Sequence, residues 1–162
     1  MCIFAPENRK EKEEQERESR DMNSQFSQKM SEVLAYSREE AIRLQTGFIG
    51  VEHLMLGMIR KGDGKAIEML NALSVDLLQI KRQLEDGLKE KTADDVSSFQ
   101  IFSHADELAL SEEAGRLLRL SVLEARIQRK LEVDTEHMLL AILKEGNNMA
   151  AKILKDNSVN YQ

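Results

Sequence analysis

The sequence repeats itself after 84 positions, and this repeat limits the possible folds more than any other feature. When residues 27–76 are laid over residues 111–160 without a gap, 13 of the 50 positions are identical. Average residue usage gives roughly 3 identities by chance. The identities include a serine at the start of each unit and a Glu-His pair further on: Ser27 and Ser111, Glu52-His53 and Glu136-His137. The repeat predicts a tandem duplication with pseudo-two-fold symmetry, in which equivalent residues form two similar sites.

Each unit has the apolar spacing of helices. Met30, Val33, Ser37 and Ala41 fall on one helical face, and this spacing recurs through the unit. The chain has one proline and 4% aromatic residues, which argues against a sandwich or barrel. We therefore predict an all-α fold of two pseudo-symmetric four-helix repeats. A unit of about 60 residues is marginally stable alone, so the two are expected to share a core.

The chain divides by composition. The first 22 residues are almost entirely polar after a short apolar start, with opposite charges four apart such as Arg9 and Glu13, and predict a solvated tail. The second unit ends at Gln162, where its fourth helix should begin, so we expect a truncated eighth helix and uncovered apolar surface, unless the natural chain continues. The expected parts are a tail over 1–22 and a domain over 23–162, made of repeat one (26–88), a linker (89–107) and repeat two (108–162).

Charge and cysteine content exclude several function classes. The net charge is −6 and no basic run occurs, so we expect neither nucleic acid nor an anionic membrane as a partner. Cys2 is the only cysteine, which excludes an intrachain disulfide and suits a reducing compartment. The start of the chain lacks the pattern of a signal peptide, and no segment has the length of a membrane helix.

The Glu-His pairs are the candidates for chemistry. Gly50 and Asp134 stand where N-caps should be, so Glu52 and Glu136 fall at the second helical position, which the helix dipole favours for a carboxylate. These glutamates therefore either stabilise helix starts, with the histidines as capping or interhelix partners, or bind a ligand.

Catalytic and metal sites are not expected. Adjacent Glu and His on a helix point about 100° apart, and no His-Glu-x-x-His motif occurs, so we assign no metal. The chain also lacks a Gly-x-Ser-x-Gly motif and a phosphate-binding loop, so we assign no catalytic residue and no cofactor. The remaining enzyme hypothesis uses the Glu-His pairs as acid–base pairs. Several methionines are assigned to inward stripes of the core: Met55, Met58, Met69, Met138 and Met149.

These motifs resemble a known family. Residues 27–41, 50–57 and 62–64 are similar to the amino-terminal domain of Clp AAA+ unfoldases, and most of all to the ClpC type, with its Glu-His-hydrophobic-Leu-Leu-Gly core. The resemblance covers about residues 23–160, in both repeats. It implies a domain of eight helices that receives protein substrates and adaptors, such as MecA-like proteins. The parent protein would be a hexameric, bacterial cytoplasmic ATPase that feeds the ClpP peptidase, with ATP and magnesium bound only in its ATPase modules.

The resemblance also implies a ligand. ClpC relatives recognise phosphorylated arginine at one site per repeat, where the glutamate binds the guanidinium and a hydroxyl at the start of the first helix holds the phosphate. Carried onto this sequence, the pairs are Glu52 with Ser27 and Glu136 with Ser111. Asp134, in place of the glycine of repeat one, would repel a phosphate. The alternative is a stand-alone helical regulator without ATPase modules. The fragment itself is expected to be a monomer or weak dimer.

Overall fold

The computed structural model describes residues 9–11, 13–14, 17, 25–94 and 108–161. The described chain is helical with short connections, and its only β-type pairing consists of two isolated bridges. The predicted all-α fold is therefore confirmed. The helices over 25–161 are α2 (Gln28–Arg43), α3 (Val51–Lys61), α4 (Lys65–Ala72), α5 (Leu77–Asp94), α6 (Glu112–Ile127), α7 (Thr135–Glu145) and α8 (Met149–Asp156).

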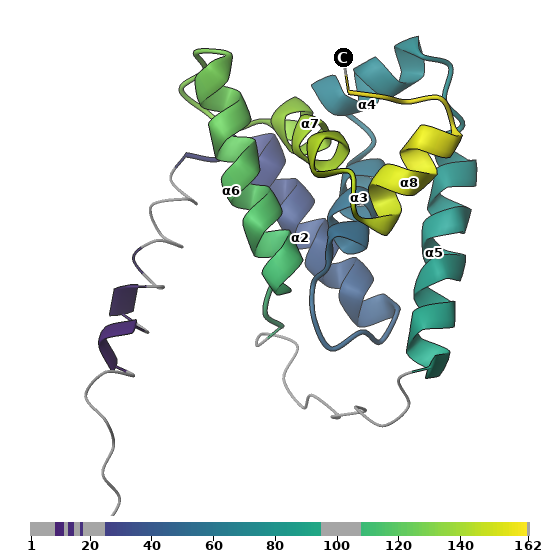
Figure 1. Cartoon of the computed structure of the whole chain (residues 1–162), viewed down its shortest axis with the longest axis horizontal. Helices are drawn as coiled ribbons and strands as arrows, with labels where there is room; N and C mark the ends of the chain where they lie inside the picture. The colour runs from purple at the N-terminus through teal and green to yellow at the C-terminus, as the bar shows by residue number, and fades with distance from the viewer. Residues whose placement is uncertain (1–8, 12, 15–16, 18–24, 95–107, 162) are drawn as a thin grey trace, which may run out of the picture.

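The two repeats interleave. Repeat one contributes α2 to α5, and repeat two contributes α6 to α8 within the described residues. In each repeat the first helix packs on the second, α2 on α3 and α6 on α7, while the short third helix crosses over: α4 contacts α7 and α8 contacts α3. Figure 1 shows α5 and α6 at opposite sides, with α3 and α7 between them. The second helices therefore form the centre of the molecule.

A pseudo-two-fold axis relates the repeats. Phe26 forms a parallel bridge with Val133, and Ile49 forms one with Leu110. Leu110 and Val133 lie 84 positions after Phe26 and Ile49, so one rotation exchanges the two bridges. Each bridge joins the segment before the first helix of one repeat to the segment before the second helix of the other. The predicted symmetry is confirmed.

One apolar core runs through both repeats. Its buried residues form a single cluster with members on every helix from α2 to α8. Because this core is shared, neither repeat has an apolar interior of its own. The largest fully buried side chains are Met30, Leu54, Met55, Leu56, Met58, Leu70, Ile80, Leu84, Leu117, Leu118, Met138 and Leu139.

The helix ends are capped in the same way in both repeats. Ser27 caps α2 and Ser111 caps α6, each accepting a hydrogen bond at 3.1 Å from the backbone N–H three residues on. Gly62 and Gly146 end α3 and α7 in the left-handed conformation, with φ of 73° and 65°. This conformation is easily adopted by glycine, which lacks a Cβ.

Helix α5 is longer than expected. The predicted linker over 89–107 is wrong at its start, because α5 continues to Asp94. The buried stripe of this helix ends at Leu88, and the polar turn that follows resembles a linker in sequence. Lys91 in this turn contacts Glu52, as described below. The remaining residues of that prediction, 95–107, lie outside the described residues.

Two apolar residues of α4 point outward. Met69 was assigned to the core, but both Met69 and the C-cap residue Leu73 are exposed, so that assignment is wrong for Met69. Their counterparts in α8 are Ile153 and Asn157, and α8 packs against α5, with Asn157 Nδ2 donating to Gln83 Oε1 at 3.1 Å. By symmetry, a fourth helix of repeat two would cover the corresponding face of α4. No described helix covers this face of α4.

Helices α2 and α3 approach closely at Gly57. A Cβ at this position would lie 2.3 Å from Ser37 Oγ and 2.6 Å from the carbonyl oxygen of Val33. The same hydroxyl donates to that carbonyl at 2.7 Å. The counterpart in α7 is Ala141, so the second pair of helices leaves room for a methyl group.

The described residues of the tail are helical. Arg9 Nε lies 3.3 Å from Glu13 Oε1, as the i,i+4 spacing predicts. Both side chains are exposed, so the pair adds only a few tenths of a kcal/mol, about 0.2–0.5. Of the helices in the described part of the chain, none is both long and apolar enough to span a bilayer.

Candidate functional site

The Glu-His pairs open α3 and α7, as predicted. The N-caps are Gly50 and Asp134, which puts the glutamates at the second helical position and the histidines at the third. The backbone N–H of each N-cap residue donates to Nδ1 of the histidine at 2.9 Å. This is the return bond of a capping box, with histidine in place of Glu or Gln. The capping role, one of the two left open for the histidines, is confirmed.

The two histidine rings differ in their second nitrogen. Because Nδ1 accepts, the proton of the neutral ring is on Nε2. In His53, Nε2 lies 2.9 Å from Thr46 Oγ1, and burial lowers the pKa of this histidine to about 4. In repeat two Lys130 replaces Thr46, and Nε2 of His137 has no hydrogen-bond partner among the described residues. Burial also lowers the pKa of His137, so both rings are neutral at physiological pH.

The two glutamates are buried, with exposed fractions of 5% for Glu52 and 7% for Glu136. Each meets a lysine from repeat one: Lys91 Nζ lies 3.0 Å from Glu52 Oε1, and Lys65 Nζ lies 3.4 Å from Glu136 Oε1. The second oxygen of Glu136, Oε2, is buried and has no hydrogen-bond partner within the described residues. Buried polar atoms are nearly always satisfied, so this oxygen is available to a donor from a ligand or water.

The N-cap serines bond across the repeats, to the segments that lead into the glutamate-bearing helices α3 and α7. The resemblance pairs Ser27 with Glu52 and Ser111 with Glu136, and this pairing stays a prediction, but the backbone hydrogen bonds of the two serines run to the other repeat. The backbone N–H of Ser27 donates at 2.9 Å to the carbonyl just before the N-cap of α7, and Ser111 makes the same bond to the carbonyl before the N-cap of α3. The first helix of each repeat thus begins beside the second helix of the other. We call the combination of Glu52 with Ser111 site one, and that of Glu136 with Ser27 site two.

The N-cap residues make the two sites unequal. In site two, Ser27 Oγ donates to Asp134 Oδ1 at 3.0 Å, so a second carboxylate occupies the mouth of the site. In site one the same position is Gly50, where a Cβ would lie 2.9 Å from Glu52 Oε2. A side chain at residue 50 would therefore crowd the glutamate.

Site two opens into a pocket of about 480 Å³. This volume is sufficient for a long amino-acid side chain. The lining combines three cationic with three anionic side chains, so it can contact groups of either sign. The lining residues are Lys65, Arg129, Lys130, Leu131, Glu132, Asp134, Glu136 and His137.

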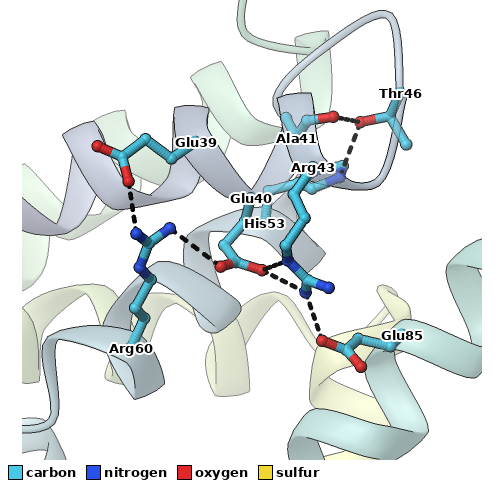
Figure 2. A network of polar contacts seen from close by, with 8 residues as sticks. All are labelled: Glu39, Glu40, Ala41, Arg43, Thr46, His53, Arg60 and Glu85. Atoms are coloured by element: carbon cyan, nitrogen blue, oxygen red, sulfur yellow. Dashed lines mark hydrogen bonds and ion pairs between the residues drawn. The ribbon is translucent and has the colours of Figure 1, made fainter.

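A buried carboxylate that the sequence analysis left without a role holds three helices together. Glu40 accepts from Arg43 at 2.6 and 3.0 Å and from Arg60 at 3.2 Å. Arg43 also contacts Glu85 of α5, and Arg60 lies 2.6 Å from Glu39 (Figure 2). This network joins α2, α3 and α5, and both oxygens of the Glu40 carboxylate accept hydrogen bonds from arginines within the molecule.

Repeat two has a simpler version of this network. Glu124, the counterpart of Glu40, is buried and accepts from Lys144 at 2.7 Å and from the Tyr161 hydroxyl at 3.5 Å. The signal that could have revealed both is an identical glutamate, 84 positions apart, on an apolar helix face. Among the described residues, no group of three His, Cys, Asp or Glu side chains is arranged to hold a metal ion. Cys2 lies outside the described residues.

The fold and the sites together define a duplicated all-α domain in which each repeat completes the candidate site of the other. Comparison with known proteins gives the family. The Clp repeat (R) N-terminal domain model matches residues 25–157, and the chain belongs to this family.

The relatives and solved structures agree with this assignment. The chain is 32% identical over 141 residues to the chaperone protein ClpB of Oceanobacillus iheyensis, and 31% identical over 138 residues to the negative regulator of genetic competence ClpC/MecB of Bacillus subtilis. Each match covers 85% of the chain but only 16% of the relative. The N-terminal domain of the E. coli ClpV1 ATPase has the same fold, with a TM-score of 0.70 at 15% identity over 91% of this chain and 86% of that one. The N-terminal domain of Arabidopsis thaliana ClpD matches with a TM-score of 0.59 at 16% identity over 85% of this chain and 88% of that one.

Proposed function

We propose that this chain is the docking domain through which a Clp ATPase receives protein substrates and adaptors. Membership of the family supports this role, and the relatives are about six times longer than the matched region, since the chain spans 16% of their length. The ATPase activity, the hexameric assembly, ATP and magnesium, and delivery to the ClpP peptidase belong in this proposal to the parent protein in the bacterial cytoplasm. The fragment itself acts by binding and not by catalysis.

The ligand class that we propose is phosphorylated arginine, at site one. The observation that supports this proposal is the hydrogen bond from the backbone N–H of Ser111 to the carbonyl of Ile49, which joins the start of α6 to the segment just before α3, the helix that carries the buried Glu52. A carboxylate pairs with the planar guanidinium group through two parallel hydrogen bonds. The N-terminus of α6, with the hydroxyl of Ser111 and free backbone N–H groups, attracts a phosphate. Lys91, which now contacts Glu52, adds a positive charge that a phosphate can use.

Site two is a poorer phosphate site. The carboxylate of Asp134 already accepts the Ser27 hydroxyl, and it would repel a phosphate placed there. The free oxygen of Glu136 still suits a guanidinium or ammonium group. The two sites are therefore proposed to differ in phosphate preference, with site one binding the phosphorylated side chain more tightly.

Calorimetry with a short phosphoarginine peptide tests the proposal. We expect Glu52→Gln to weaken binding at least about tenfold, because a neutral amide loses the charge-assisted pair. Glu136→Gln should have a smaller effect, and Asp134→Gly should strengthen binding in the Glu52→Gln background by removing the repelling carboxylate. Asp156→Asn, an exposed change at the end of α8, is the control and should bind as the unmodified chain does.

Absence of binding by the unmodified chain, or unchanged binding by Glu52→Gln, would overturn the phosphoarginine part. Equal binding of an unphosphorylated arginine peptide would show that the phosphate is not recognised. The role in a Clp ATPase is tested separately by the downstream reading frame, which should encode a phosphate-binding loop of the Gly-x-x-x-x-Gly-Lys-Ser/Thr type.

A further inference from the structure

Apolar side chains are exposed on the outer surface of α6 and the loop that follows it. Leu123, Ile127 and Leu131 have exposed fractions of 50%, 67% and 97%. Leu123 and Ile127 lie one turn apart on the same helical face, and Leu131 follows in the turn that leaves the helix. Helix α6 lies at one side of the molecule, away from α5 (Figure 1). Single exposed apolar residues are common, but three on one segment indicate an interaction surface.

The other repeat shows that the fold does not need these apolar residues. Their counterparts, 84 positions earlier, are Glu39, Arg43 and Gly47. Glu39 pairs with Arg60, and Arg43 pairs with Glu40, so the same positions in α2 carry charges that bind within the molecule. The apolar surface is therefore a property of α6 and not of the duplicated fold.

The surface around these apolar residues is positively charged. From residue 116 to residue 131 there are five cationic side chains and one anionic side chain, Glu124, which is buried and neutralised by Lys144. At the two ends of this segment, Arg116 Nη1 lies 3.2 Å from Glu112 Oε1, and the exposed Glu132 follows Leu131, so the positive charge is concentrated around Leu123 and Ile127. Arg119 and Arg126 flank Leu123 along the helix and have no ion pair with any described residue. The matching segment of α2, residues 32–47, holds three anionic and two cationic side chains. In a chain of net charge −6, this face is a local exception.

The surface also reaches the pocket of site two. Arg129, Lys130 and Leu131, at the end of this segment, line that pocket together with Glu136. A polypeptide lying along α6 could therefore extend into the pocket. A nucleic acid would contact the arginines but would leave the leucine and isoleucine side chains without an apolar partner. A membrane-binding face usually has a wider apolar stripe that includes aromatic residues. Aliphatic side chains surrounded by arginines best match an apolar face surrounded by carboxylates.

We propose that the outer face of α6, from Arg116 to Leu131, docks an acidic amphipathic helical segment of a partner protein. That the partner is a protein rests on the proposed function. The docking surface on α6 and the acidic, amphipathic character of the partner helix are new. The apolar residues contact the apolar stripe of the partner helix, and the arginines pair with its acidic flanks. The carboxylates of the partner helix are attracted by the arginines of α6, which steers the partner to this face. Leu123 and Ile127 then pack against the apolar stripe of the partner and exclude water.

Fluorescence anisotropy with a labelled peptide tests this surface. The probe is a helical peptide of about 18 residues with leucine at every third and fourth position and glutamate at the flanking positions. We expect binding that weakens with added sodium chloride. The triple variant L123S/I127S/L131S and the double variant R119E/R126E should each weaken binding at least about tenfold. These side chains are exposed, so both variants should keep the circular dichroism spectrum of the unmodified chain.

Three comparisons decide the result. L73S/L78S removes two exposed leucines elsewhere and should bind the probe as the unmodified chain does. A scrambled peptide of equal composition should bind at least about tenfold more weakly. The double variant R119E/R126E, which changes neither glutamate site, should bind the phosphoarginine peptide within twofold of the unmodified chain, so the loss of phosphoarginine binding and the loss of this surface are separable outcomes.

The proposal is overturned if the unmodified chain does not bind the probe, or if it binds the scrambled peptide equally well. It is also overturned if the triple variant binds unchanged, or if L73S/L78S weakens binding as much as the triple variant does. Binding of phosphatidylglycerol vesicles without binding of the peptide would assign the surface to a membrane. A concentration-dependent dimer in sedimentation that the triple variant abolishes, without peptide binding, would assign it to a second copy of this chain.

Discussion

Glu52 and Glu136 are ionisable side chains held in nearly complete burial at the starts of helices. The helix dipole and one lysine each stabilise their charge. Their position in the second helical residue followed from the sequence, because Gly50 and Asp134 mark the helix starts. Their lysine partners did not, since these come from helices that are distant in sequence and meet the glutamates only in the folded chain. The crossed serines were missed for the same reason.

The buried imidazole of His53 predicts a pH-dependent stability. Its pKa falls from 6.5 to about 4 on folding, so below pH 6.5 the unfolded chain takes up a proton that the folded chain does not. The free energy of unfolding should therefore decrease as the pH falls from about 6.5 towards 4, by about 2 kcal/mol at pH 5 from this group alone. Urea unfolding at pH 7.5 and pH 5 measures this decrease.

The matched variant is His53→Gln, whose amide oxygen can still accept from the N-cap N–H. It should lose less stability between the two pH values than the unmodified chain, whatever its stability at pH 7.5. Equal losses in the two proteins would show that another group titrates, since every remaining carboxylate and His137 are common to both.

At the scale of single helices, the sequence was sufficient to predict a helix boundary where one capping residue determines that boundary. The N-caps of α3 and α7 were found at Gly50 and Asp134, where they were expected. Two predictions failed where the outcome depends on packing. The end of α5 is polar in sequence although it is helical, and the outward side of α4 is apolar although no described helix covers it. Periodicity reports the apolar face of a helix, but it does not report whether a neighbour covers that face.

The contact between α2 and α3 makes a prediction about Gly57. Alanine in a helix is usually more stable than glycine by about 1 kcal/mol. At Gly57 the added methyl would meet Ser37 Oγ and the backbone of α2, so Gly57→Ala should destabilise the protein by about 1–3 kcal/mol. Gly115→Ala on α6 is the matched control, because a Cβ there has no neighbour within 4 Å, and it should stabilise by about 0.5–1 kcal/mol. Stabilisation by both substitutions in urea unfolding would contradict the close approach.

At the scale of the whole molecule, two half-size units share one interior. The repeat in the sequence predicted the symmetry correctly, because identical units that bury a common face pack around a two-fold axis. The repeat could not predict whether the short third helix packs on its own repeat or on the other one. Both arrangements are symmetric, so both are compatible with an 84-residue offset. The structure decides for crossing, with α4 on α7 and α8 on α3.

The shared interior predicts that neither unit folds alone. A fragment over residues 1–94 and one over 108–162 should each show little cooperative unfolding in circular dichroism, because each exposes half of the common core. When mixed in equal amounts, they should recover helical signal and a cooperative transition. Cooperative unfolding of either fragment by itself would show that one repeat carries a sufficient core.

The crossed arrangement also bears on how such a chain arose. A single ancestral unit contains both the serine and the glutamate, but in the duplicated fold the serine of each repeat bonds to the segment before the second helix of the other. Two copies of that unit around a two-fold axis would create both combinations at once, so we infer that the sites existed in a homodimer before its genes were fused. Mixing the two fragments reproduces that state, and failure to assemble would count against the inference. Fusion then allowed the halves to evolve independently, as the aspartate at residue 134 and the glycine at residue 50 illustrate.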